Sequence, residues 1–108
     1  FANAVRATGR RNLIMGGLTT DVCLVPPALS AKAEGFNVVA MLDISAATTR
    51  TAAATSKDLL SANGIESMVV TPMITHLLGN YKNPASGAFF EAMQIEGGFA
   101  AFAKGNLR

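Results

Sequence analysis

The feature that most constrains the fold is the stretch at residues 12–25, where a short apolar run passes directly into a helix start. Leu13, Ile14 and Met15 form a run that is typical of a strand buried on both faces. Glycines, threonines and an aspartate then interrupt the run, and these residues favour turns and helix starts. Cys23, the only cysteine of the sequence, falls within about the first turn of that helix. The stretch therefore predicts a buried strand followed by a helix that carries a thiol near its start.

The same alternation continues along the chain. Three strand patterns separated by helix patterns, with short connections, imply a parallel sheet with right-handed crossovers and helices packed on its faces. The predicted fold class is α/β. In chain order we expect a helix end at 1–8, a strand at 12–18, a helix at 21–34, a strand at 36–44, a helix at 48–63, a strand at 65–71 closed by Pro72, and helices at 73–81, 86–94 and 99–104.

Two prolines, Pro26 and Pro27, fall inside the expected helix at 21–34. A proline in a helix interior removes a hydrogen bond and costs about 3 kcal/mol. Either the regular helix starts late, with both prolines in its first turn, or the helix is bent there. Both alternatives leave Cys23 at the N-terminal end of the helix.

Composition limits the classes of protein that fit. Half of the 108 residues are hydrophobic and 15% are charged, which indicates a folded chain with part of its surface covered, in a homo-oligomer or by a missing segment. The nine basic and seven acidic residues form no long basic run, which argues against a nucleic-acid partner. No apolar run is long enough for a membrane span, and one cysteine allows no internal disulfide. We therefore expect a cytoplasmic location.

The sequence also predicts two parts. Residues 1–72 would carry the sheet, and residues 73–108 would form a helical arm whose aromatic residues pack on a neighbouring subunit. The alternative, an arm that folds back on its own sheet, stays open.

Cys23 is the first candidate for chemistry. A lone cysteine is often inert core packing, but a strand end, two glycines and hydroxyl residues before it favour an active site. The positive end of a helix dipole favours a thiolate, which attacks electrophilic carbonyl carbons.

The run Gly17-Leu18-Thr19-Thr20-Asp21-Val22-Cys23, preceded by Gly-Arg-Arg-Asn-Leu-Ile and followed by Pro-Ala-Leu-Ser-Ala-x-Ala-Glu-Gly-Phe-Asn-Val, closely resembles the isochorismatase-like cysteine hydrolases. The resemblance covers residues 9–71, and within the family it is greatest to the uncharacterised oligomeric hydrolases. It implies a three-layer αβα fold with a parallel sheet, of which this chain has the C-terminal half. It also implies that the N-terminal half of the same domain is a partner.

The resemblance further implies roles for individual residues. Cys23 would be the nucleophile, the Leu18–Thr19 peptide would be cis, and the Thr19 N–H together with the Cys23 N–H would bind the substrate oxyanion. Asp21 does not match the catalytic aspartate of the family, and we interpret it as a helix cap or a loop-fixing residue. The family's aspartate and lysine precede the segment present here, so we expect this chain alone to be inactive. The lysines that do not lie at the matching place are Lys32, Lys57, Lys82 and Lys104.

The remaining candidates are weaker. His76 lacks a partner at metal-ligand spacing, so we expect no metal site within this chain, and whether the missing half binds a metal stays open. No cofactor is expected. The threonines at Thr48, Thr49 and Thr51, with Arg50, could meet an anion at a helix start or simply cap the helix. Asp43, at a strand end, is interpreted as ordering the neighbouring loops.

Three functions follow from this reading. The leading hypothesis is a cysteine-dependent hydrolase acting on a small amide or another carbon–nitrogen bond through a thioester-type intermediate. The alternative is a catalytically incomplete chain that serves as a binding or assembly module. A phosphate or nucleotide site at Thr19 and Thr20 is weaker, because the spacing matches neither a Walker loop nor a dinucleotide fingerprint.

Overall fold

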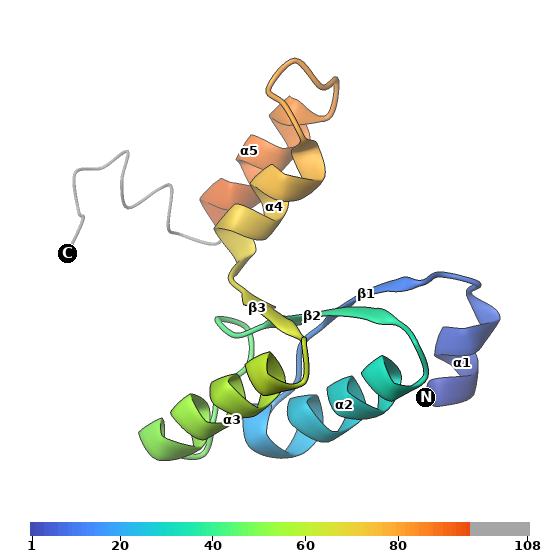
Figure 1. Ribbon diagram of the computed structural model, residues 1–108. Coiled ribbons are helices and arrows are strands. Elements are labelled where there is room, and N and C mark those ends of the chain that lie inside the picture. The colour runs from blue at the N-terminus through green and yellow to red at the C-terminus, as the bar shows by residue number, and fades with distance from the viewer. Residues whose placement is uncertain (96–108) are drawn as a thin grey trace. The chain divides into compact units, whose positions relative to one another are not determined.

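A computed structural model describes residues 1–95 of the chain (Figure 1). The chain divides into two compact units, the first spanning Phe1–Met68 and the second beginning at Val69. We refer to them as unit 1 and unit 2 and describe each by itself.

Unit 1 contains a three-stranded parallel sheet in the order β1-β2-β3. The strands are β1 at Asn12–Met15, β2 at Asn37–Met41 and β3 at Glu66–Met68. Ile14 pairs with Val39, and Val39 pairs in turn with Glu66, so these three residues share one face of the sheet. The predicted α/β class with a parallel sheet is confirmed.

The helices of unit 1 lie on the other face. They are α1 at Ala2–Ala7, a π-helical turn η1 at Thr20–Leu24, α2 at Val25–Ala33 and α3 at Arg50–Ala62. Helices α2 and α3 contact each other and lie side by side on one side of the sheet (Figure 1). Unit 1 by itself therefore has two layers, which correspond to part of the predicted three-layer arrangement.

The local sequence explains where these helices begin. Both prolines stand in the first turn of α2, where a missing N–H costs no hydrogen bond, so the late start of the regular helix is confirmed. The Thr49 side chain caps α3 by accepting from the Ala52 N–H at 3.0 Å. Helix α3 is thus capped at its N-terminal end.

The core of unit 1 lies between the sheet and these two helices. Leu24, Leu60 and Ile65 are fully buried there. Because burial of apolar surface is the main favourable term in folding, this cluster holds the helix layer on the sheet. The complete cluster is Leu24, Val25, Ala28, Val38, Ala40, Leu60 and Ile65.

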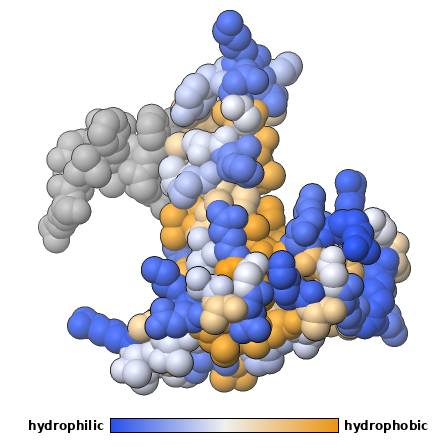
Figure 2. Space-filling view, in the orientation of Figure 1, coloured by the Kyte–Doolittle hydropathy of each residue, from blue (hydrophilic) through white to orange (hydrophobic). Residues whose placement is uncertain are grey.

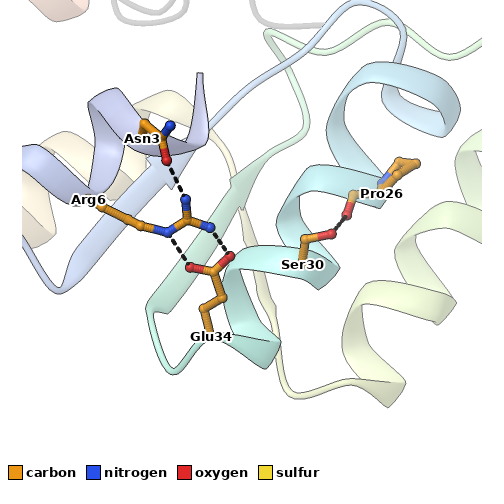
Figure 3. A network of polar contacts seen from close by, with 5 residues as sticks. All are labelled: Asn3, Arg6, Pro26, Ser30 and Glu34. Atoms are coloured by element: carbon orange, nitrogen blue, oxygen red, sulfur yellow. Dashed lines mark hydrogen bonds and ion pairs between the residues drawn. The ribbon is translucent and has the colours of Figure 1, made fainter.

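Helix α1 is tied to α2 by a forked ion pair (Figure 3). The Arg6 guanidinium donates to both carboxylate oxygens of Glu34, at 2.9 and 2.6 Å, and also to the Asn3 side chain at 2.8 Å. The hydrogen bond and charge of Arg6 lower the pKa of the Glu34 carboxyl. Because both side chains are exposed, the pair sets the position of α1 more than it stabilises the fold.

All three strands are shorter than predicted: the first two were expected to end at 18 and 44, but β1 ends at Met15 and β2 at Met41. We expected a strand over 65–71 closed by Pro72, but β3 ends at Met68 and helix α4 occupies Val70–Leu78. Pro72 lies in the first turn of α4, where proline favours a helix, so interpreting it as a strand terminator was wrong. Helix α4 ends at Gly79, whose φ of 77° suits glycine.

Unit 2 is a helical hairpin of α4 and α5, the latter at Ser86–Ile95. Its buried side chains include Met73, Leu78 and Met93. The rings of Tyr81 and Phe90 stack with centroids 5.7 Å apart. The helix expected at 99–104 lies outside the described residues, and the assembly role of the arm stays a prediction. Across residues 1–95, none of the helices is long and apolar enough to cross a bilayer.

Candidate active site

The candidate site lies where β1 and β2 end. Residues 16–24 follow β1 and residues 42–49 follow β2, and hydrogen bonds join these two segments. In parallel α/β sheets the crevice outside the carboxyl ends of the strands is the usual ligand position. The predicted residues Thr19 and Cys23 both belong to the first segment.

Cys23 is exposed, on the π-helical turn η1. Three N–H groups of this turn point at one acceptor, the Thr19 carbonyl, at 3.3 Å from Val22, 2.7 Å from Cys23 and 3.3 Å from Leu24. Turns of this kind are frequent at functional sites. The thiol therefore faces solvent, whereas a core role would have buried it.

The hydrogen bond of the Cys23 N–H differs from what we expected. We expected this N–H group to join the Thr19 N–H in binding a substrate oxygen, but it already donates to the Thr19 carbonyl. The physical reason is its position: with Thr19 as the N-cap, the N–H groups of Val22, Cys23 and Leu24 all reach back to the cap carbonyl. Among residues 1–95, an N–H group that precedes the turn is left without such a partner.

Thr19 has such an N–H group. The Leu18–Thr19 peptide bond is cis, and the Thr19 backbone is extended, with φ −98° and ψ 162°. Within residues 1–95 the Thr19 N–H has no hydrogen-bond acceptor. Thr20, the next residue, is buried and held by both its N–H, which donates to the Ala46 carbonyl at 2.8 Å, and its hydroxyl, which donates to the Ser45 carbonyl.

Gly17 packs directly on the backbone of the cysteine turn. A Cβ atom at this position would lie 2.9 Å from the carbonyl carbon and oxygen of Cys23 and 3.0 Å from the Leu24 nitrogen. Those neighbours are backbone atoms that cannot rotate away. Gly17 is therefore required by space, which explains one of the two glycines in the motif.

Ser45 is a positioning residue that sequence reasoning missed. Its buried hydroxyl accepts from the Gly17 N–H at 3.1 Å and donates to the Met41 carbonyl at 2.5 Å. It thereby connects the end of β2 to the turn after β1. The sequence does carry a signal for Ser45. This residue comes just after the second predicted strand, which lies next to the strand that precedes Cys23 in a parallel sheet.

Asp21 joins the same two segments from the solvent side. Its carboxylate accepts from the Thr48 hydroxyl at 2.8 Å and from the Thr48 N–H at 3.2 Å. The hydrogen bond from the Thr48 hydroxyl is the main cause that lowers the pKa of Asp21. Of our two interpretations of Asp21, the loop-fixing role is confirmed, and the side chain does not cap the helix.

We predict that Thr48→Val moves the pKa of Asp21 up toward its ordinary value. Because the pKa of Asp21 is lowered in the folded protein, its contribution to stability is present above the unfolded pKa and is lost as the pH falls through the folded one. The variant should therefore show a weaker loss of stability in acid. Carboxyl-detected NMR titration checks the pKa, with Thr55→Val, an exposed change on α3, as control. An unchanged titration of Asp21 in Thr48→Val contradicts the prediction.

Two of the other predicted residues already have hydrogen-bond partners. The hydroxyls of Thr48 and Thr49 are used by Asp21 and by the α3 cap. His76 belongs to α4 of unit 2. Among residues 1–95, no three histidine, cysteine, aspartate or glutamate side chains gather as a metal site would require.

Sequence comparison relates this chain to one probable hydrolase. No protein-family model matches the chain. The chain is 36% identical over 87 residues to the probable hydrolase YcaC of Escherichia coli K12, a match that covers 81% of this chain and 42% of the relative.

Solved structures give the same picture. The YcaC gene product of Escherichia coli, described as an octameric hydrolase of unknown specificity, matches with a TM-score of 0.76 and 28% identity, over 88% of this chain and 52% of that one. YcaC from Pseudomonas aeruginosa, solved with hexane-2,5-diol and covalent acrylamide, matches with a TM-score of 0.76 and 29% identity, over 89% and 52%. The MAR1 ribonuclease of Caenorhabditis elegans, at 17% identity and a TM-score of 0.76, shares the fold alone. The chain spans about half the length of the relatives it matches.

Proposed function

This chain is homologous to the YcaC-type hydrolases of the isochorismatase-like family over about half of their length, and on this premise we propose that it carries the nucleophile of a cysteine-dependent hydrolase. The substrate would be a small amide or another compound with a hydrolysable carbon–nitrogen bond. The single observation that carries the proposal is the exposed thiol of Cys23 on a turn fixed at the carboxyl ends of two parallel strands.

The proposed chemistry follows from two groups of this turn. The Cys23 sulfur attacks the carbonyl carbon, a carbon–sulfur bond forms, and the carbonyl oxygen becomes an oxyanion. The Thr19 N–H, which has no acceptor among residues 1–95, donates to that oxyanion. The oxyanion then re-forms the carbonyl as the carbon–nitrogen bond breaks, and the nitrogen leaves as an amine that carries the proton given up by the thiol. Water then hydrolyses the thioester, which releases the carboxylic acid and restores the thiol. We assign the Cys23 N–H no part in this step, because it is already bonded to the Thr19 carbonyl.

We assign no residue of this chain as the base that accepts the thiol proton. Asp21 is occupied by Thr48, and the family resemblance implies an aspartate and a lysine from the preceding half of the domain. The proposal therefore concerns a complete enzyme to which this chain contributes the nucleophile and one oxyanion donor. The Pseudomonas aeruginosa relative was solved with covalent acrylamide, so that protein carries a nucleophile that adds to this electrophile, as a thiolate would.

The proposal is tested by ammonia release from a panel of small primary amides. We expect the complete protein to release ammonia from at least one of them and the Cys23→Ala variant to lose this activity by a factor of about a thousand or more. Unchanged activity in the variant would refute the role of Cys23.

The same measurement distinguishes the hydrolase from the second candidate function, a non-catalytic assembly module. The Escherichia coli relative is described as an octamer, and Leu77 and Tyr81 of unit 2 are exposed apolar residues suited to contact between copies. A chain that forms a large assembly by light scattering, but neither releases ammonia nor reacts at Cys23, would be the assembly module.

A further inference from the structure

Thr19 lies between two residues that are both hydrogen-bonded to the loop after β2. Before it, the Gly17 N–H donates to the Ser45 hydroxyl at 3.1 Å. After it, the Thr20 N–H donates to the Ala46 carbonyl at 2.8 Å, and the Thr20 hydroxyl donates to the Ser45 carbonyl. Two consecutive residues of that loop therefore hold the segment 17–20 at both of its ends.

Thr20 makes the more buried of these two attachments. It is 2% exposed and Ser45 is 6% exposed, whereas Gly17 is only partly buried. A hydrogen bond in such a poorly solvated place is stronger than one at the surface, and breaking it leaves a polar group without water. Because the Thr20 hydroxyl is buried and already donates to the Ser45 carbonyl, any part that it has in catalysis must act through a neighbouring group.

The same attachment does not depend on the part of the relatives that this chain does not span. Thr20, Ser45 and Ala46 all belong to unit 1, and their hydrogen bonds are internal to it. The group that lies next to Thr20 in the chain is the Thr19 backbone, which carries the N–H without an acceptor among residues 1–95.

We propose that Thr20 is a positioning residue whose hydroxyl keeps the Thr19 N–H aimed at the substrate oxyanion. This inference rests on the role of that N–H in the proposed hydrolase. With Thr20 held by two hydrogen bonds and Gly17 by one, the segment that carries the Thr19 N–H has little freedom to turn. An oxyanion donor accelerates a reaction because it is already in place when the charge develops, and a misplacement of about 1 Å can cost about a hundredfold in rate.

Reversible addition of propanal to Cys23 of the complete protein tests the proposal without requiring turnover. The sulfur bonds to the carbonyl carbon, the carbonyl oxygen takes up the thiol proton, and that oxygen accepts from the Thr19 N–H. We expect Thr20→Val, which keeps the shape of the side chain but removes the hydroxyl, to weaken this adduct about tenfold, as the loss of one hydrogen bond would. Thr20→Ser retains the hydroxyl and should bind propanal within about threefold of the parent. Titration with ¹³C-labelled propanal, followed by NMR, measures the adduct, with Cys23→Ala as the blank.

Alkylation by iodoacetamide distinguishes positioning from a general loss of structure. The sulfur displaces iodide from a saturated carbon, the thiol proton goes to solvent, and no oxyanion forms. Thr20→Val should therefore be alkylated at Cys23 within about twofold of the parent rate, while its kcat/KM for amide hydrolysis falls about a hundredfold.

Thr8→Val is the matched control for Thr20→Val. It also removes a hydroxyl that donates to a backbone carbonyl, here that of Val5 at 2.7 Å. Thr8 is the C-cap of α1, at the end of unit 1 where hydrophilic residues gather around that helix (Figure 2). This variant should match the parent in all three assays.

Three results would overturn the role of Thr20. The first is a propanal adduct that is as stable in Thr20→Val as in the parent. The second is a parallel loss of adduct and of alkylation in that variant, which would show a structural role alone. The third is a parent that forms no adduct, because it would have no oxyanion site to position. If the adduct depends on Thr20 but no amide is hydrolysed, Thr20 positions the donor as proposed and the hydrolase proposal fails instead.

Discussion

Acrylamide will add to Cys23 faster than to free cysteine at pH 7, and the Cys23→Ser variant will form no thiol adduct. The thiol is exposed and stands near the start of a helical stretch that runs from η1 into α2, where the positive end of the helix dipole stabilises the negative charge that develops as the sulfur adds to acrylamide. Because the sequence has no second cysteine, intact-mass measurement over time follows this one residue without ambiguity. We expect an adduct on the parent protein and none on the variant, because serine is a far weaker nucleophile at this pH.

A synthetic peptide of residues 18–26 is the matched control for that reaction. It carries the same thiol and the same neighbours in sequence, but it lacks Ser45, Thr48 and the strands that shape the turn. If the peptide reacts as fast as the folded chain, the fold does not activate the sulfur. In that case the exposed position of Cys23 has no catalytic meaning.

Gly17→Ala will destabilise unit 1 by about 3 kcal/mol, the upper end of what an added methyl group costs in a packed site. The new Cβ atom would stand 2.9 Å from the Cys23 carbonyl and 3.0 Å from the Leu24 nitrogen. Since both neighbours are backbone, relief requires a shift of the whole η1 turn. We therefore also expect slower addition of acrylamide to Cys23. Thermal unfolding and adduct formation measure the two effects.

Gly16→Ala is the control for this substitution, because it adds the same atom one residue earlier. There the nearest atom, at 2.9 Å, is the Cδ1 atom of the exposed Ile44 side chain, which can rotate away. The loss of unfolded-state entropy on replacing glycine also favours this variant by a few tenths of a kcal/mol or more. Equal destabilisation by Gly16→Ala and Gly17→Ala would show that the close approach of Gly17 to the cysteine turn is unimportant.

Local sequence patterns were sufficient for the parallel sheet and for the order of its strands and helices, but each strand ends three residues earlier than predicted, at Met15, Met41 and Met68. The apolar runs before Gly16 and after Phe36 gave strands, and Asn63-Gly64 gave the end of α3, because burial and turn chemistry act over a few residues. The boundary at Pro72 was wrong for a physical reason. Proline ends a strand and also suits the first turn of a helix, so its local preference cannot distinguish the two.

The sequence by itself determined that a lone thiol follows an apolar strand at a helix start. The expectation that this strand is buried on both faces was wrong for the described residues, because β1 lies at the edge of the sheet and Ile14 is 51% exposed. Only the tertiary structure decided how that turn is held. Ser45 and Thr48 reach it from the loop after a neighbouring strand, and the Cys23 N–H is used within the turn while the Thr19 N–H has no acceptor among residues 1–95. Hydrogen bonds between segments more than twenty residues apart depend on strand register and order, and no local pattern encodes either.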